Sequence, residues 1–133
     1  MSKSTLIFSL ILCLINKSNQ AQTGTVKIDT LLVGTWNGTS VCQLKNSPCH
    51  DETVVYHISK KSGIDTFYIN ANKIVNNKED EMGILPFVYN KETNQLTSTA
   101  YGTWTFNIQG VKLEGTLFVH GDLFRKIIVY KHY

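Results

Sequence analysis

The sequence contains little arginine, and its excess of positive charge is small. Its 133 residues include 13 Lys and Arg against 10 Asp and Glu, and Arg125 is the single arginine. Nucleic-acid-binding surfaces gather Lys and Arg on one face, whereas the lysines here are scattered singly. We therefore expect no nucleic-acid partner.

Long hydrophobic runs are also missing. The run Thr5–Ile15 has eleven residues, whereas a membrane-spanning helix needs about 20. We therefore expect no stable membrane insertion. The run follows Lys3 and precedes polar Asn16–Gln22, which is the pattern of a secretory signal peptide.

We predict that residues 1–21 form this signal peptide, with cleavage after Ala21. Removal of Lys3 and Lys17 lowers the net charge from +3 to +1 and leaves 112 residues, enough for one domain. The expected organisation is an N-terminal segment 22–31 and a single domain 32–133 in a secreted or periplasmic protein. The alternative, a lipoprotein anchored through Cys13, fits poorly because Leu12 stands where a small residue is expected.

Cysteine is sparse. Three are encoded, and loss of Cys13 leaves Cys42 and Cys49. In an oxidising compartment such a pair favours a disulfide, which would staple the connection between the first two strands. The competing interpretation is a metal site that adds His50 and Asp51, but its spacing matches no established zinc pattern. We predict the disulfide, no metal and no cofactor.

A helical pattern of ten or more residues is absent after Leu32, and short alternating segments take its place. In Thr103–Gln109, Trp104, Phe106 and Ile108 share one face, as in a half-buried strand. Turn-forming residues separate the segments. The sequence predicts eight strands: 34–44, 53–59, 66–75, 82–90, 96–101, 103–109, 112–120 and 123–131.

Eight short sequential strands can form an up-and-down barrel or a sandwich. The steady succession of hairpins favours the barrel, because a Greek key needs at least one long crossover. We predict an all-β, single up-and-down antiparallel eight-stranded barrel. A barrel of this size is filled by side chains or holds one small ligand.

The chain resembles the lipocalins and the wider calycin group at Gly34-Thr35-Trp36 in the first strand and Arg125 in the last. The resemblance implies that Trp36 closes one end of the barrel and that Arg125 packs across its indole. The C-terminal helix of typical lipocalins is missing. A small barrel with one early disulfide is also similar to the bacterial periplasmic metalloprotease inhibitors.

Two interpretations of the interior remain open. Small residues opposite aromatic ones indicate either an interdigitated core or a cavity with aromatic walls. If there is a cavity, its expected ligand-binding walls are Phe87, Tyr89, Trp104, Phe106 and Leu117.

Polar clusters that suggest catalysis have simpler explanations. Asp51 and Glu52 are adjacent on a strand, so they point to opposite faces and cannot easily flank one substrate. We expect His57 to be exposed and Glu79–Glu81 to be a solvated turn. We assign no catalytic residue and no role to His50, Asp51 or Glu52.

We therefore expect a binding protein rather than an enzyme, which holds a small apolar or amphipathic ligand in its barrel. The alternative is an interaction module with a filled core, such as an envelope protease inhibitor acting through Gln22–Leu31 or its loops. The sequence leaves the ligand and any protein partner unidentified.

Overall fold

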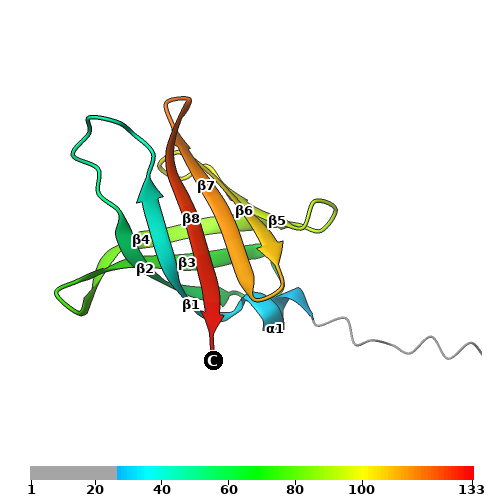
Figure 1. The fold of residues 1–133 in the computed structure, drawn as a ribbon. Coiled ribbons are helices and arrows are strands. Elements are labelled where there is room, and N and C mark those ends of the chain that lie inside the picture. The colour runs from blue at the N-terminus through cyan, green and yellow to red at the C-terminus, as the bar shows by residue number, and fades with distance from the viewer. Residues whose placement is uncertain (1–26) are drawn as a thin grey trace, which may run out of the picture.

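The computed structural model describes residues 27–133, which form one short helix and eight strands (Figure 1). The predicted signal peptide 1–21 and residues 22–26 of segment 22–31 lie outside the described residues. The elements are α1 (Ile28–Leu32), β1 (Gly34–Cys42), β2 (Glu52–Lys60), β3 (Thr66–Val75), β4 (Lys78–Asn90), β5 (Gln95–Ser98), β6 (Thr103–Gln109), β7 (Lys112–Val119) and β8 (Asp122–His132). Among residues 27–133, no helix has the length and apolar character needed to cross a membrane.

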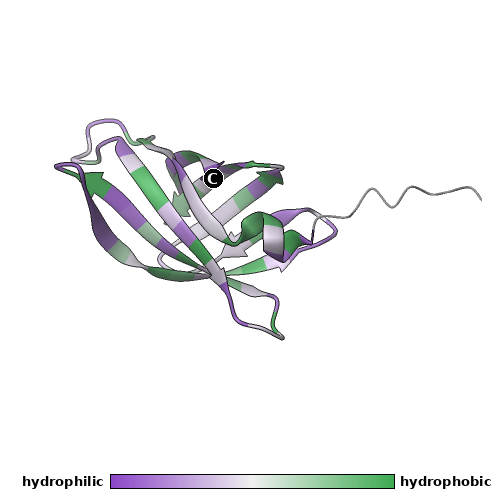
Figure 2. Ribbon diagram, turned by 90° about the horizontal axis from the view of Figure 1, so that it is seen from below, coloured by the Kyte–Doolittle hydropathy of each residue, from purple (hydrophilic) through white to green (hydrophobic). Residues whose placement is uncertain are grey.

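The strands close into one barrel. Each strand pairs antiparallel with the next, and β8 pairs with β1. The predicted all-β, up-and-down eight-stranded barrel is therefore confirmed. Inward and outward positions alternate along the strands, and Figure 2 shows the matching alternation of hydrophobic and hydrophilic residues.

The two ends of the barrel differ. Because the strands alternate in direction, the β1–β2, β3–β4, β5–β6 and β7–β8 connections share one end of the barrel, here called the upper end. The other three connections and α1 lie at the opposite, lower end. At the upper end, Asn76 and Asn77 join β3 to β4, both with positive φ (52° and 62°). Two such residues make a tight hairpin turn. Residues 79–81 are exposed, as expected, but the predicted turn there is wrong, because they already belong to β4.

Aromatic rings fill the middle of the barrel. Phe106 lies 5.5 Å from Phe87 and 6.1 Å from Tyr56 between ring centroids. Gly115 makes room for the Phe106 ring, because a Cβ at this glycine would lie 2.3 Å from it. In the middle of the barrel, the small Gly115 opposite the aromatic Phe106 therefore belongs to an interdigitated core and does not border a cavity.

Helix α1 covers the lower end (Figure 2). Leu32 is fully buried, and its carbonyl accepts a 2.8 Å hydrogen bond from the indole Nε1 of Trp36, which is itself fully buried. The Lys131 ammonium donates to the carbonyls of Thr30 (2.9 Å) and Leu31 (2.6 Å). Trp36 therefore closes this end together with α1.

The contact expected between Arg125 and Trp36 does not form. Trp36 pairs with Lys131 across β1 and β8, and Arg125 pairs with Cys42 at the other end of β1. The cation above the Trp36 ring is the Lys131 Nζ, 6.0 Å from the ring centroid. The prediction for Arg125 is corrected because the β1–β8 register carries it to the upper end.

Candidate binding site at the upper end of the barrel

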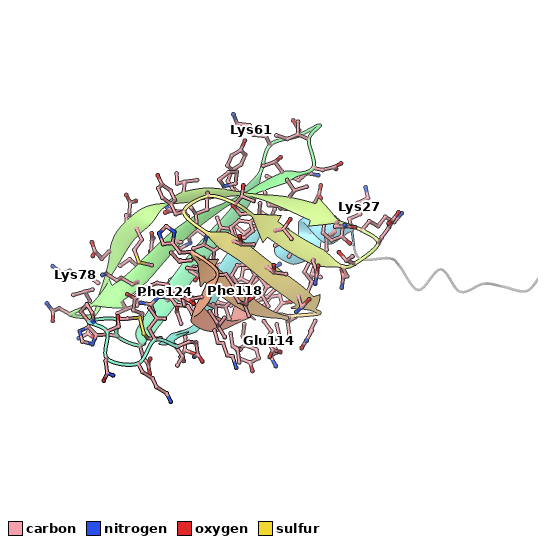
Figure 3. The ribbon with its side chains drawn as sticks, turned by 90° about the horizontal axis from the view of Figure 1, so that it is seen from above. Lys27, Lys61, Lys78, Glu114, Phe118 and Phe124 are labelled. Atoms are coloured by element: carbon pink, nitrogen blue, oxygen red, sulfur yellow. A yellow bond between two sulfur atoms is a disulfide. The ribbon has the colours of Figure 1, made fainter. Side chains whose placement is uncertain are left out.

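A cavity of about 280 Å³ opens at the upper end of the barrel. Figure 3 looks onto this end, with Phe124 labelled beside Phe118. Most lining side chains are apolar or aromatic, and a small polar group accompanies them. The lining residues are Ser40, Glu52, Tyr56, Ala71, Met82, Gly83, Leu85, Tyr101, Trp104, Leu117, Phe124 and Arg125.

Two of the five predicted wall residues, Trp104 and Leu117, line this cavity. Phe87 and Phe106 do not, because they are almost fully buried in the packed layer beneath it. Tyr89 packs against the lower part of the core, and its hydroxyl donates to Asn94 Oδ1 at 3.3 Å. Alternation along a strand identified inward positions but not their height in the barrel.

Trp104 joins the cavity to the packed layer. Between ring centroids, its indole lies 6.4 Å from Phe106 in a nearly stacked arrangement and 6.2 Å from Phe87 in an edge-to-face arrangement. The indole Nε1 donates a 2.8 Å hydrogen bond to the carbonyl of Ala100. These contacts fix the ring as a rigid wall.

A β-bulge shapes the opposite wall. Asn70 pairs with Ile84 and Asn72 pairs with Glu81, so both Met82 and Gly83 face Ala71 across the ladder. Gly83 has φ 130°, which side-chain-bearing residues rarely adopt. The extra residue bends β4 at the cavity, where Ala71 and Gly83 take up little side-chain volume.

Arg125 forms the polar end of the cavity. Its Nη1 donates to the Ser40 carbonyl (3.2 Å), the Ser40 hydroxyl (3.3 Å) and the His50 carbonyl (3.0 Å). Its Nη2 lies 3.5 Å from Glu52 Oε1, and the two side chains are 11% and 21% exposed. The guanidinium is thus held by three fixed acceptors and one carboxylate.

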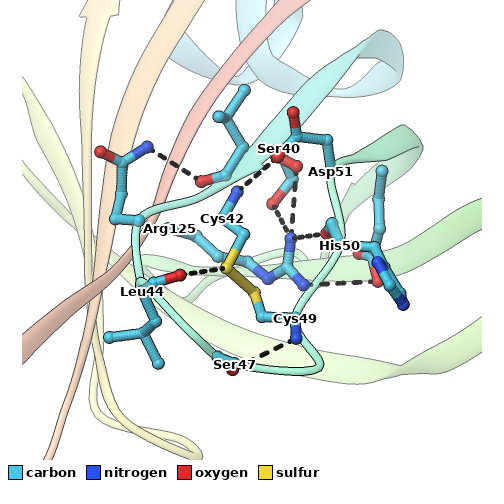
Figure 4. Close-up of a disulfide and its surroundings, with 11 residues drawn as sticks. Ser40, Cys42, Leu44, Ser47, Cys49, His50, Asp51 and Arg125 are labelled. Atoms are coloured by element: carbon cyan, nitrogen blue, oxygen red, sulfur yellow. Dashed lines mark hydrogen bonds and ion pairs between the residues drawn. A yellow bond between two sulfur atoms is a disulfide. The ribbon is translucent and has the colours of Figure 1, made fainter.

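The loop between β1 and β2 supplies part of this arrangement (Figure 4). Cys42 and Cys49 form the predicted disulfide, with their Cα atoms 5.8 Å apart. Because the two sulfurs bond to each other, the alternative metal site loses its thiolates. The Cys42 amide donates to Asp51 Oδ1 at 2.9 Å. His50, Asp51 and Glu52 therefore all have structural contacts that the sequence did not reveal.

Tyr56 lies beside this polar group and is 2% exposed. Burial, and then the Glu52 carboxylate, raise the pKa of its hydroxyl, and Arg125 acts in the opposite direction. The hydroxyl therefore stays protonated at physiological pH. It can donate or accept a hydrogen bond within the cavity.

A second polar cluster lies on the outer face of the barrel. His57 Nε2 is 2.8 Å from Glu79 Oε2, and its Nδ1 is 3.2 Å from Thr35 Oγ1. Asn72 Nδ2 donates to the same Glu79 oxygen at 2.9 Å. These two hydrogen bonds lower the pKa of the Glu79 carboxyl. His57 is thus half-exposed and bonded, where the sequence suggested simple exposure.

Several cavity residues were missed at the level of the sequence, above all Glu52, Tyr56 and Ala71. A signal did exist for Tyr56, because Val54, Tyr56 and Ile58 alternate as an apolar face. The same alternation carries Glu52 to the inner face of β2. Ala71 gave no signal, because its place in the cavity depends on the bulge in β4.

The chain was compared with protein-family models, curated proteins and solved structures, and no match was found in any of the three. The disulfide indicates an oxidising compartment.

Proposed function

We propose that the protein is a secreted or periplasmic binding protein that carries or sequesters a small amphipathic molecule in the upper cavity. The observation that carries this proposal is the cavity itself, with aromatic walls and one polar end. Small-molecule sites combine a mostly apolar lining with a few placed polar groups. The disulfide and the signal-peptide pattern support export.

The size of the cavity limits the ligand. Its volume of about 280 Å³ lies at the lower limit of typical ligand cavities, which begin near 300 Å³. The rings of Phe87 and Phe106 occupy the layer below. We therefore expect a compound of one or two rings, and not a long acyl chain.

The cavity favours a carrier over an interaction module with a filled core. We also propose that the protein is not an enzyme. The Asp51 carboxylate is occupied as an acceptor for the Cys42 amide, and Glu52 is paired with Arg125. Both carboxylates thus have structural partners.

Native mass spectrometry of the protein purified from its own host tests the proposal. We expect a retained small molecule in the unaltered protein and its loss in Ala71→Leu, whose larger side chain projects into the cavity. Thr39→Leu is the control, because Thr39 is exposed on β1. A protein that retains nothing, or a ligand unaffected by Ala71→Leu, contradicts a carrier using this cavity.

A further inference from the structure

We propose that the upper cavity selects a neutral ring compound with a hydrogen-bond donor and acceptor side by side, as in a carboxamide or a lactam. This inference deepens the proposed function and depends on it. The donor would face Glu52, the acceptor would face Arg125 and Tyr56, and the ring would lie against Trp104.

The charges at the polar end favour a neutral ligand. Glu52 and Arg125 are the only Asp, Glu, Lys or Arg residues among those lining the cavity, and their charged atoms lie 3.5 Å apart. Their opposite charges therefore compensate each other. A charged ligand would be attracted by one of these two residues and repelled by the other. The free energy lost when the ligand's charge leaves water would then not be recovered.

The hydrogen bonds at the polar end favour a ligand that both donates and accepts. Within residues 27–133, no hydrogen bond to the Glu52 carboxylate or the Tyr56 hydroxyl is formed by another protein group. Among the described residues, Asn72 Oδ1 is the only fully buried side-chain oxygen or nitrogen without a hydrogen-bond partner. The Tyr56 hydroxyl oxygen is therefore not sealed off from the cavity. The Glu52 carboxylate, which has acceptor sites beyond its contact with Arg125, and the Tyr56 hydroxyl can therefore bond a molecule in the cavity.

The apolar walls favour a ring. The flat Trp104 indole stands on one side, and Leu85 and Leu117 also line the cavity. Aromatic rings stack or meet edge to face with an indole at little conformational cost. The volume accommodates one such ring with a small substituent.

Three probes of nearly equal size test the inference: benzamide is neutral, benzoate is anionic and benzylammonium is cationic. Each is titrated into the mature protein at pH 7, and the indole N–H signal of Trp104 is followed by NMR. The Trp36 indole is an internal control, because it is buried beside α1 at the other end. We expect benzamide to bind about tenfold more tightly than either charged probe, since it alone pairs with both charged groups.

The variant Glu52→Gln changes the charge at nearly constant shape. It leaves Arg125 uncompensated, so we expect benzoate to gain about tenfold, which removes the preference for benzamide. Tyr56→Phe is a second variant and should weaken benzamide while the fold is kept. The comparison of the three probes on the unaltered protein needs no variant to fold.

Other outcomes separate the inference from the proposed function. Tighter binding of benzoate or benzylammonium to the unaltered protein overturns the inference but leaves a carrier. An unchanged preference in folded Glu52→Gln also overturns it. If no probe shifts Trp104, the inference fails, and native mass spectrometry then decides the proposed function independently.

Discussion

At the scale of single residues, close packing in the lower and middle layers depends on Gly115 and Phe106. A methyl group at Gly115 would approach the Phe106 ring to 2.3 Å and the Thr105 carbonyl to 3.0 Å. Well-packed interiors resist such added volume, because neighbouring side chains must leave their preferred rotamers. The glycine is therefore a packing residue rather than a turn residue.

We predict that Gly115→Ala lowers the free energy of unfolding by about 1–3 kcal/mol. Urea titration followed by circular dichroism measures the change. The double variant with Phe106→Leu is the control, because a smaller side chain relieves the contact and should make the two effects less than additive. Strict additivity would show that the alanine does not meet Phe106.

The Glu79 carboxyl predicts a pH dependence of stability. Its pKa in the folded protein lies below the ordinary value of 4.5 because His57 and Asn72 donate hydrogen bonds to it. A depressed folded pKa contributes stability that is present above the ordinary value and is lost as pH falls through the folded pKa. Glu79→Gln has no such contribution.

We therefore expect the unaltered protein to exceed Glu79→Gln in stability at about pH 5.5, and this advantage to be smaller at about pH 3, below the ordinary pKa. Chemical unfolding of both proteins at the two pH values measures the difference. Glu92→Gln, at an exposed position in the β4–β5 connection, is the control. A constant gap between the first two proteins would contradict the role of Glu79.

At the scale of elements, the β1–β2 loop connects the disulfide to the cavity. The disulfide holds the loop that carries His50, and the His50 carbonyl accepts a hydrogen bond from Arg125. Loss of the disulfide should therefore affect the polar end as well as the stability of the fold.

We predict that the double variant Cys42→Ser, Cys49→Ser loses about 2–3 kcal/mol of stability, because the unfolded chain gains freedom. Its affinity for benzamide should fall as Arg125 loses a fixed acceptor. Thermal unfolding and the Trp104 NMR titration measure the two effects. Lys45→Ala in the same loop is the control, because Lys45 is exposed, and should leave affinity unchanged; an equal loss there would exclude a specific role for the disulfide.

Strand β6 and the pairing between β1 and β8 differ in how well the sequence predicted them. Alternation in β6 identified Phe106 and Ile108 as buried, because side-chain direction in a strand depends only on local period. The pairing between β1 and β8 is not local. The inner face of β8 carries two basic residues, Arg125 and Lys131, and only the register decides which one meets Trp36.

The candidate site was less predictable than the fold for the same reason. Trp104 and Leu117 were identified, but Phe87 and Phe106 lie one layer lower. The height of a residue in a barrel depends on strand tilt and stagger. The bulge at Met82–Gly83 further shifts β4 by one residue. Neither feature has a signal in hydrophobic periodicity.

At the scale of the whole molecule, the barrel is packed below and hollow above, and α1 secures the packed end. Lys131, near the end of β8, bonds the carbonyls of Thr30 and Leu31, while Lys60 pairs with Asp29 at 2.8 Å. Two strands therefore hold the helix against the barrel.

We predict that Lys131→Met destabilises the protein by about 1–3 kcal/mol, since two carbonyls lose a charged donor. Amide hydrogen exchange in residues 28–33 should accelerate more than exchange in β6. Lys126→Met is the control, because Lys126 is exposed on the same strand. Equal effects of the two substitutions would show that Lys131 does not anchor α1.

The position of α1 has a practical consequence for binding experiments. The described chain begins at Lys27 beside α1, and β8 ends at His132 at the same lower end (Figure 1). A C-terminal tag would therefore extend away from the cavity mouth. Protein immobilised through that tag on a sensor surface should present the open end of every molecule to dissolved compounds, which makes surface-based screening for the ligand feasible without redesign of the chain.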